Sequence, residues 1–247
     1  AYVTLFNTDL LPAFGKYPIN QIKQIDLQVF INRYTEKELF RTAQKLYQLL
    51  NALFEYAVSD EIINRNPMKL IKIPVYEQEH GVPLTRTEEK EFIVNFRKSN
   101  DLFFQAYVLM LYTGIRRSEI HSLNYNEKWI IVTTAKQRKG KAEKQRKIPI
   151  SPMLQNEISH IKIDEIKKLP LDGLTRNFKK ICPTHHLHDL RHTFITRCQE
   201  CGIQREIVSL WAGHAADSSV TSTVYTHLEQ YTQNQIAEIK KFSYILQ

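Results

Sequence analysis

The sequence predicts a mainly α-helical fold in two domains, with a small antiparallel β-sheet in the second domain. Between residues 26 and 67, apolar side chains recur at alternating spacings of three and four, the pattern of amphipathic helices. Residues 71–84 contain two prolines and a glycine without such periodicity, which predicts an exposed linker. Farther on, the β-branched segments 129–134 and 146–151 predict an antiparallel hairpin. We therefore expect one domain at 1–77 and another at 78–247.

The composition is that of a globular protein with a sizeable core, since 43% of the 247 residues are apolar and 24% are charged. No apolar run reaches the roughly 18 residues of a membrane span, and the N-terminus lacks the pattern of a signal peptide. Cys182, Cys198 and Cys201 have no metal-binding spacing, so reduced thiols in a cytoplasm are expected. The chain begins at Ala1 without a methionine, which is consistent with a fragment of a longer protein.

The first domain is expected to contain one long helix, because six apolar residues from Leu39 to Ala57 fall on a single helical face. Thr35 and Glu38 have the spacing of a capping box and predict its beginning. Asn66 and Pro67 are expected to end the helical region. Six basic residues of this domain are candidate phosphate contacts: Lys16, Lys23, Arg33, Lys37, Arg41 and Lys45.

The second domain is expected to begin with a helix over residues 85–96, because Thr85 and Glu88 form another capping box. Residues 102–112 are almost entirely apolar and predict a buried helix, which Gly114 can end in the left-handed conformation. Further helices are expected at 153–180, with an interruption at 170–173, at 203–211 and at 235–246.

The positive charge is concentrated in the predicted hairpin. Lysines and arginines outnumber acidic residues by eight in the whole chain, and residues 136–147 contribute six of these charges. Such clustering is typical of a surface that binds nucleic acid. A solvated basic hairpin without a ligand would show the same pattern.

Residues 185–194 combine four histidines and an arginine with an apolar stripe. As a helix, this segment places His188 and Arg191 on one face, three positions apart, and the apolar stripe toward the core. A guanidinium beside an imidazole suits an oxyanion such as phosphate. On this segment alone, a half-buried helix with polar side chains is an equally good interpretation.

Four short segments resemble, in order and spacing, those of the tyrosine recombinase (phage integrase) family. They are TGIRRSE at 113–119, HDLRHTF at 188–194, Gly213-His214 and Tyr225-Thr226-His227. Each match alone is weak, but four in the family's order, spanning nearly the whole chain, are specific. The sequence departs from the family at Ala212, often a leucine, and at Arg117, often apolar, and neither change removes a catalytic group.

The resemblance implies that the protein cleaves and rejoins DNA strands through a covalent 3′-phosphotyrosine, with neither a metal nor another cofactor. Arg116 and Arg191 would hold the scissile phosphate and stabilise the charge of the transition state, and His214 would donate to a phosphate oxygen. Tyr225 would be the nucleophile and His188 would accept its proton. Tyr231 is a weaker candidate for the nucleophile, and Glu119 is expected to pair with an arginine.

The family uses a hairpin lysine to protonate the leaving 5′ oxygen, and two lysines compete for this role. Counting from the first strand favours Lys136, whereas counting back from the second favours Lys141. We prefer Lys136, since longer hairpins in the family extend after the lysine. The predicted DNA contacts are Lys139, Lys141, Lys144 and Arg146.

The resemblance further implies a helical core-site-binding domain followed by a catalytic domain, in an integrase of a phage or integrative mobile element. The expected partner is double-stranded DNA at core or crossover sites, bound by a homodimer per site and a tetramer in synapsis. The expected location is the nucleoid in a bacterial cytoplasm, with no membrane partner. The C-terminal stripe of Ile236, Ile239, Phe242 and Ile245 is a candidate to dock on a neighbouring subunit. A non-cleaving DNA-binding protein of this fold and a type IB topoisomerase are the alternatives.

Overall fold

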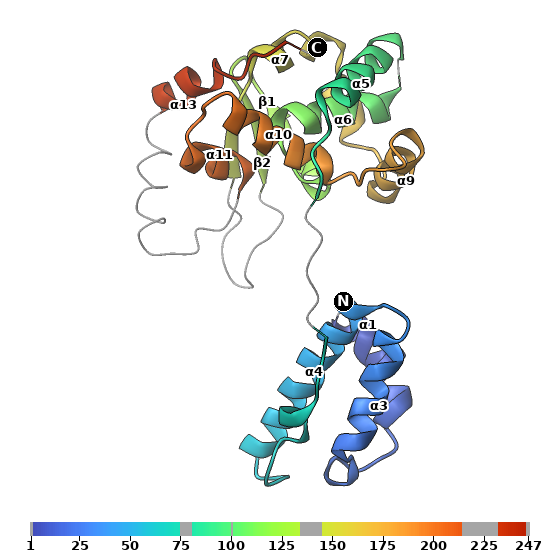
Figure 1. The fold of residues 1–247 in the computed structure, drawn as a ribbon. Coiled ribbons are helices and arrows are strands. Elements are labelled where there is room, and N and C mark those ends of the chain that lie inside the picture. Colours follow the sequence, from blue (N-terminus) through green and yellow to red (C-terminus); the bar gives the residue numbers. More distant parts are fainter. Residues whose placement is uncertain (1, 75–80, 100, 134–144, 214–231, 246–247) are drawn as a thin grey trace. The chain divides into compact units, whose positions relative to one another are not determined.

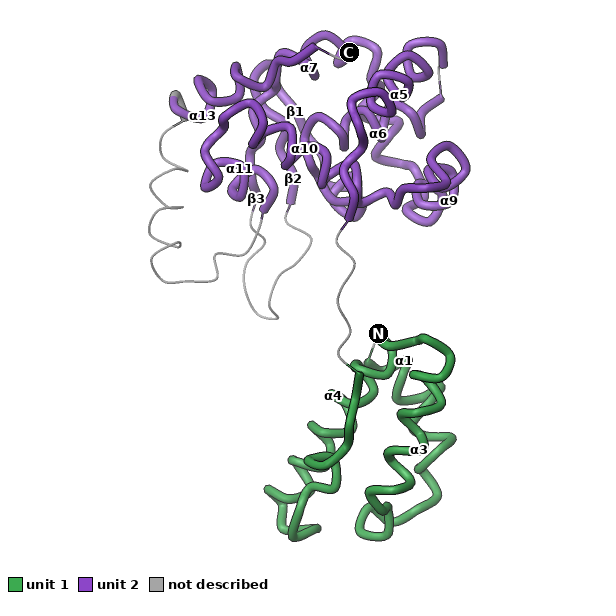
Figure 2. The backbone as a smooth tube through the Cα atoms, in the orientation of Figure 1, with its two compact units in different colours: residues 1–79 green, residues 80–247 purple. Residues whose placement is uncertain are grey.

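The computed structural model describes residues 2–74, 81–99, 101–133, 145–213 and 232–245 (Figure 1). The chain divides into two compact units, Ala1–Glu79 (unit 1) and His80–Gln247 (unit 2), each with its own hydrophobic core (Figure 2). Most described residues are helical, and one three-stranded sheet lies in unit 2. Within the described ranges, no helix is both long and apolar enough to cross a membrane.

Unit 1 is organised around α3 (Gln24–Thr35) and α4 (Phe40–Ser59), which pack against each other. Before them lie α1 (Tyr2–Leu5), a π-helical turn (Phe6–Leu10), α2 (Leu11–Phe14) and a 3-10 turn (Ile19–Gln21). Most of the apolar face predicted for the long helix is buried, but Leu53 is only half-buried and Leu39, which precedes the helix, is exposed. The core contains Leu10, Leu27, Phe30, Ile31, Ala43, Leu46, Leu50, Phe54, Met68 and Ile71.

The capping box predicted at Thr35 and Glu38 is wrong. Thr35 is the last residue of α3, and its hydroxyl donates to the carbonyl oxygen of Asn32 at 3.0 Å. Glu38 has a φ of 57° and lies in the turn between the helices. The next helix, α4, begins at Phe40 without a side-chain cap. The polar residues of the pattern therefore form a turn at the point where a helix start was expected.

Asn66 also differs from its predicted role as a helix stop. Its side-chain oxygen accepts the backbone N–H of Met68 at 2.8 Å and so begins a 3-10 turn over Pro67–Leu70. Its amide nitrogen donates to Asn51 at 3.0 Å and to Glu55 at 2.7 Å, both on α4. This buried asparagine thus ties the end of unit 1 to its longest helix.

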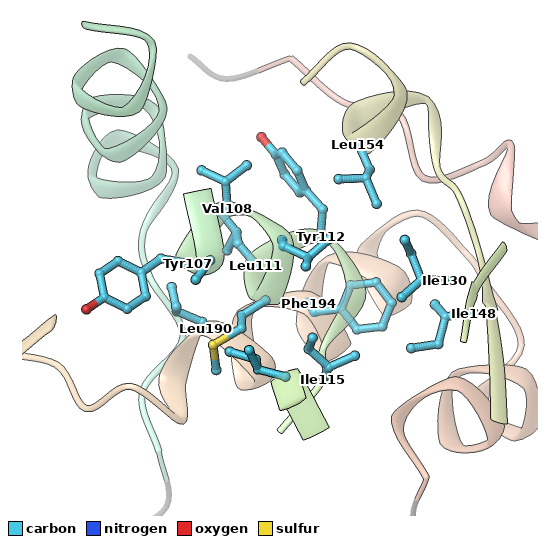
Figure 3. Packing of buried hydrophobic residues seen from close by; sticks show 14 of the residues in the cluster. Tyr107, Val108, Leu111, Tyr112, Ile115, Ile130, Ile148, Leu154, Leu190 and Phe194 are labelled. Atoms are coloured by element: carbon cyan, nitrogen blue, oxygen red, sulfur yellow. The ribbon is translucent and has the colours of Figure 1, made fainter. Parts of the chain in front are cut away.

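The central element of unit 2 is α6 (Leu102–Thr113), the buried helix that the apolar run predicted. It ends at Gly114 with a φ of 65°, which confirms the left-handed end. Figure 3 shows side chains of α6 close to Leu154, Phe194 and the strand residues Ile130 and Ile148. Before it, α5 (Arg86–Lys98) begins with the predicted capping box, in which Thr85 and Glu88 exchange hydrogen bonds.

The sheet of unit 2 has the antiparallel order β1-β2-β3, with β1 (Asn124–Tyr125), β2 (Trp129–Thr133) and β3 (Gln145–Pro149). In β2 and β3, Ile130 and Ile148 are directly opposite and fully buried. The two predicted strands are confirmed to within about two residues at each end. The two-residue strand β1 was not predicted, because it is too short to show a period.

Helices surround this core (Figure 1). They are a 3-10 turn (Arg117–Ser122), α7 (Pro152–Gln155), a 3-10 turn (Ile158–His160), α8 (Ile163–Ile166), α9 (Leu171–Ile181), α10 (Asp189–Glu200), α11 (Arg205–Ala212) and α13 (Thr232–Ile239). The interruption predicted around residues 170–173 lies slightly earlier, at 167–170, between α8 and α9. Pro170 immediately precedes α9, and the buried Gly173 lies within it. A second interruption, which was not predicted, separates α7 from α8 and contains only a 3-10 turn.

The C-terminal segment has its apolar residues in the core of unit 2 itself. Ile239 and Phe242 are only 2% and 0% exposed, and the Phe242 ring lies 5.3 Å from that of Phe194. Ile245 lies outside this core and is 83% exposed. The prediction that the whole stripe is available to a neighbouring subunit is therefore wrong, because two of its members already have partners in this chain.

Candidate functional site

The end of α6 fixes the first arginine box against α10. A Cβ atom at Gly114 would lie 2.4 Å from Cδ1 of Phe194, so only glycine lets the two helices approach this closely. Ile115 is buried next to it, and Arg116 then precedes the 3-10 turn Arg117–Ser122. The backbone of Arg116 is therefore positioned by the packing of the core on both sides.

Arg116 is held by Glu119 and by the end of α11. The backbone N–H of Arg116 donates to Glu119 Oε2 at 2.7 Å, and its Nη1 donates to Oε1 at 3.1 Å. Its Nη2 donates to the carbonyl oxygen of Gly213 at 2.8 Å, and the side chain remains 18% exposed. These bonds confirm that Glu119 pairs with an arginine, and the Arg116 side chain remains partly exposed.

Arg117 points elsewhere, which supports the choice of Arg116 for the site. Its Nη1 donates to Thr175 Oγ1 at 2.7 Å and lies 3.6 Å from Asp172 Oδ1, both on α9. Adjacent arginines in the sequence thus diverge, one toward Glu119 and the other toward a surface helix.

Arg146 is buried within the same cluster. Its Nη1 and Nη2 donate to the two oxygens of Glu119 at 2.5 and 2.6 Å, and its Nε donates to the carbonyl oxygen of Trp211 at 2.7 Å. Only 5% of the residue is exposed. The expectation that Arg146 is one of the exposed DNA contacts of the hairpin is therefore corrected, because its guanidinium faces inward from β3 and is bound to Glu119.

Arg191 lies in the first turns of α10 and is 2% exposed. Its Nη1 donates to the carbonyl oxygen of Gly114 at 2.7 Å, whereas its buried Nη2 has no hydrogen-bond partner among the described residues. Burial, and then the positive charges of Arg116 and Arg146, lower the pKa of Arg191. The protonated form of Arg191 is thus destabilised by burial and by the neighbouring positive charges, and a bound anion would stabilise it.

His188 does not lie within the helix as predicted, because α10 begins one residue later, at Asp189. Its ring packs edge-on against that of His192, with the ring centroids 5.0 Å apart. Loss of hydration at the packed ring, and then the positive charges of His192, Arg191 and Arg116, lower the pKa of His188. At neutral pH His188 is therefore in the neutral form that can accept a proton.

Gly81 is a feature of the site that the sequence did not reveal. A Cβ atom there would lie 2.2 Å from Cδ2 of His192 and 2.6 Å from Oδ1 of Asp189. The first described residue after the interval 75–80 thus packs against the helix start that carries His188. A glycine within an expected linker indicated only flexibility, so no signal in the sequence separated this close contact from an ordinary loop.

The remaining predicted site residues lie outside the described part of the chain. They are Lys136, Lys139, Lys141, Lys144, His214 and Tyr225, together with the alternative nucleophile Tyr231. Among the described residues, Arg116, His188 and Arg191 lie close enough for the charges of the two arginines to lower the pKa of His188. The described residues contain no group of three or more His, Cys, Asp or Glu side chains that could hold a metal ion.

Comparison with known proteins finds similar sequences among integrases and tyrosine recombinases. Residues 2–73 match the family model of the phage integrase central domain. A tyrosine recombinase of Thermosipho africanus is 25% identical, over 90% of this chain and 86% of its own length. The tyrosine recombinase XerC of Bacillus subtilis is 27% identical, over 83% of this chain and 76% of its own length.

Solved structures share the fold. The integrase of the transposon Tn1549, in complex with circular-intermediate DNA, matches with a TM-score of 0.65 and 24% identity, over 90% of this chain and 87% of that one. A lambda integrase dimer bound to a COC′ core site matches with a TM-score of 0.69 and 16% identity, over 88% of this chain and 87% of that one. Together with the family model and the recombinase relatives, these matches show that the chain is similar in sequence to tyrosine recombinases and shares the fold of integrases.

Proposed function

We propose that this site-specific recombinase cleaves DNA by attack of Tyr225 on a scissile phosphate, and that Arg116, His188 and Arg191 form the described part of the catalytic site. The observation that carries the proposal is the charge of the cluster. Three guanidinium groups surround a single carboxylate, and the buried Nη2 of Arg191 has no partner in the described part of the chain. A phosphate diester supplies the missing anion.

The chemistry balances without any further group. The Tyr225 oxygen forms a bond to phosphorus as its proton passes to His188, which its lowered pKa keeps neutral and ready to accept. Arg116 and Arg191 stabilise the additional negative charge on the non-bridging oxygens. The bond to the 5′ oxygen breaks, and that oxygen takes a proton from Lys136. Reversal of these steps with another 5′ end rejoins the strand.

The proposal extends to the organisation of the chain. Unit 1, with its basic residues, is assigned to core-site binding, and unit 2 to catalysis. The similar lambda integrase structures are a dimer bound to a core site and a tetramer bound to a Holliday junction. We extend these assemblies to the present chain, as a dimer at each crossover site and a tetramer in synapsis, acting in a phage or integrative mobile element.

A suicide substrate tests the cleavage. A DNA crossover site with a nick close to the scissile phosphate loses a short fragment after cleavage, so the covalent protein–DNA adduct accumulates. We expect an adduct with the wild-type chain and none with Tyr225→Phe, while both bind the intact site. Binding without an adduct in the wild type would identify a DNA-binding protein that does not cleave.

A further inference from the structure

Two arginines share the carboxylate of Glu119, and they do so unequally. Arg146 makes two short bonds to it, at 2.5 and 2.6 Å, in a parallel fork. The side chain of Arg116 makes a single, longer bond of 3.1 Å. The Arg146 side chain is 4% exposed and that of Arg116 is 18% exposed. The more deeply buried arginine therefore has the stronger interaction with the carboxylate.

The unequal bonding determines which of the two arginines can offer its positive charge to a bound anion. Burial alone would raise the pKa of Glu119, but hydrogen bonds and charge from Arg146, and then from Arg116, lower it, so the group is a carboxylate. One carboxylate neutralises one guanidinium. Because Arg146 makes the fork with Glu119, the charge of Arg116 remains for another anion. Without Arg146, the buried carboxylate would lose the two short bonds of the fork, and it would draw more of the Arg116 charge away from the substrate.

Arg146 also connects three elements. From β3, its Nε donates to the carbonyl oxygen of Trp211, while Arg116 donates to that of Gly213, so both arginines hold the end of α11. Gly213 has a φ of 66°, and a Cβ atom there would lie 3.2 Å from Cδ, Nε and Cζ of Arg146. The guanidinium is thus closely packed between the 3-10 turn and α11 and cannot move out toward DNA without breaking these contacts.

We propose that Arg146 is a positioning residue, which neutralises Glu119 so that the charge of Arg116 remains available to the scissile phosphate. The inference rests on the proposed function, because it assigns a phosphate to Arg116. It differs from a purely structural role for a buried ion pair. A structural role predicts that loss of Arg146 weakens every interaction of the site alike, whereas the proposed role predicts a specific loss of the interaction with phosphate charge.

Paired DNA substrates separate the two roles. One crossover site carries the normal scissile phosphate, and the other carries a methylphosphonate there, which removes the negative charge of that group alone. In the Tyr225→Phe background, which permits binding without cleavage, the ratio of the two dissociation constants measures the preference for the charged group. Because both constants come from one protein preparation, the ratio does not depend on the folded fraction.

We expect Tyr225→Phe alone to prefer the charged site by about tenfold, and the added Arg146→Gln to reduce that preference to about threefold or less. Adding Glu119→Gln as well removes the carboxylate that captures Arg116 and should restore much of the preference. The control is Arg97→Gln, because Arg97 also binds a buried carboxylate, donating from Nε to Glu157 at 3.0 Å, outside the site. It should leave the preference unchanged.

Three results would overturn the proposal: no preference in the reference protein, an unchanged preference in Arg146→Gln, or an equal decrease in Arg97→Gln. Cleavage by chains that retain Tyr225 distinguishes this failure from a failure of the proposed function. If the wild-type chain forms no adduct, the recombinase chemistry is wrong. If it forms an adduct and the preference does not depend on Arg146, only the role of Arg146 is wrong.

Discussion

The two ends of α10 carry two clusters of arginine and glutamate that differ in their charge balance. The site cluster comprises Arg116, Glu119, Arg146 and Arg191. The tail cluster comprises Arg86, Glu89, Arg197 and Glu200, with the C-terminal Tyr244. Three arginines meet one glutamate in the first, whereas two arginines meet two glutamates in the second. Among these described residues the site cluster thus has an excess of two positive charges, and the tail cluster is neutral.

The tail cluster balances its charges internally, although Nη1 of Arg86 is buried and, like Nη2 of Arg191, has no hydrogen-bond partner among the described residues. Arg197 lies 2.8 Å from Glu89 and 3.0 Å from Glu200, and it donates to the carbonyl oxygen of Leu84 at 2.6 Å. The Tyr244 hydroxyl donates to Glu89, and the Arg86 guanidinium lies 4.0 Å above the Tyr244 ring. The comparison shows that buried arginines serve two purposes in this protein. The arginines of the tail cluster join segments of the fold, whereas Arg116 and Arg191 of the site cluster are the ones that we propose to bind an anion.

The largest effect is expected from a substitution in the tail cluster. Arg197→Gln leaves the fully buried Glu89 without its ion-pair partner, so we expect the free energy of unfolding to fall by about 3–5 kcal/mol. Urea denaturation measures the loss. The rate constant of adduct formation, normalised to the folded fraction, should stay the same because no charge of the site has changed. A lower rate constant in fully folded protein would contradict the separation of the two clusters.

For Arg191→Met, in the site cluster, we expect the opposite result, a loss of activity without a loss of stability. The substitution removes a buried cation, one nitrogen of which has no hydrogen-bond partner in the described ranges, so the free energy of unfolding should be unchanged or higher. The rate of adduct formation should fall by about 10²–10³-fold, the usual cost of removing one preorganised donor to a developing oxyanion. Single-turnover kinetics on the suicide substrate and urea denaturation check the two halves. A clear loss of stability would show that Arg191 belongs with the structural arginines.

The sequence predicted the parts of this comparison that depend on local patterns. The buried helix α6, its end at Gly114 and the pairing of Glu119 all follow from residues close together in the chain. The burial of Arg146 could not be predicted, because it lies in a run of basic residues and its partner Glu119 is 27 positions earlier. The neutral tail cluster was missed for the same reason, since Glu89 and Tyr244 are 155 positions apart. Only the tertiary fold shows which distant side chain each of these charged groups contacts.

Glycines near the two ends of α10 offer a smaller perturbation. Gly81→Ala would place a Cβ atom within 2.2 Å of His192, next to His188, so we expect a loss of about 1–3 kcal/mol in stability and slower adduct formation. Gly202→Ala meets no atom within 4 Å, and its cost of about 1–2 kcal/mol comes only from a φ of 70°. It should therefore leave the rate unchanged. Equal rates in the two folded variants would refute a link between Gly81 and His188.

The smallest expected effect is a shift in the pH dependence of cleavage. In the proposed mechanism His188 must be neutral to accept a proton, and its pKa is lowered by lost hydration and by the charges of His192, Arg191 and Arg116. The acidic limb of kcat/KM, which reports the free enzyme, should therefore lie below the usual histidine value of about 6.5. His192→Asn removes one of these charges, so the pKa of His188 should rise and the limb should move to higher pH. A shift to lower pH would mean that His192 acts on His188 through packing and not through charge.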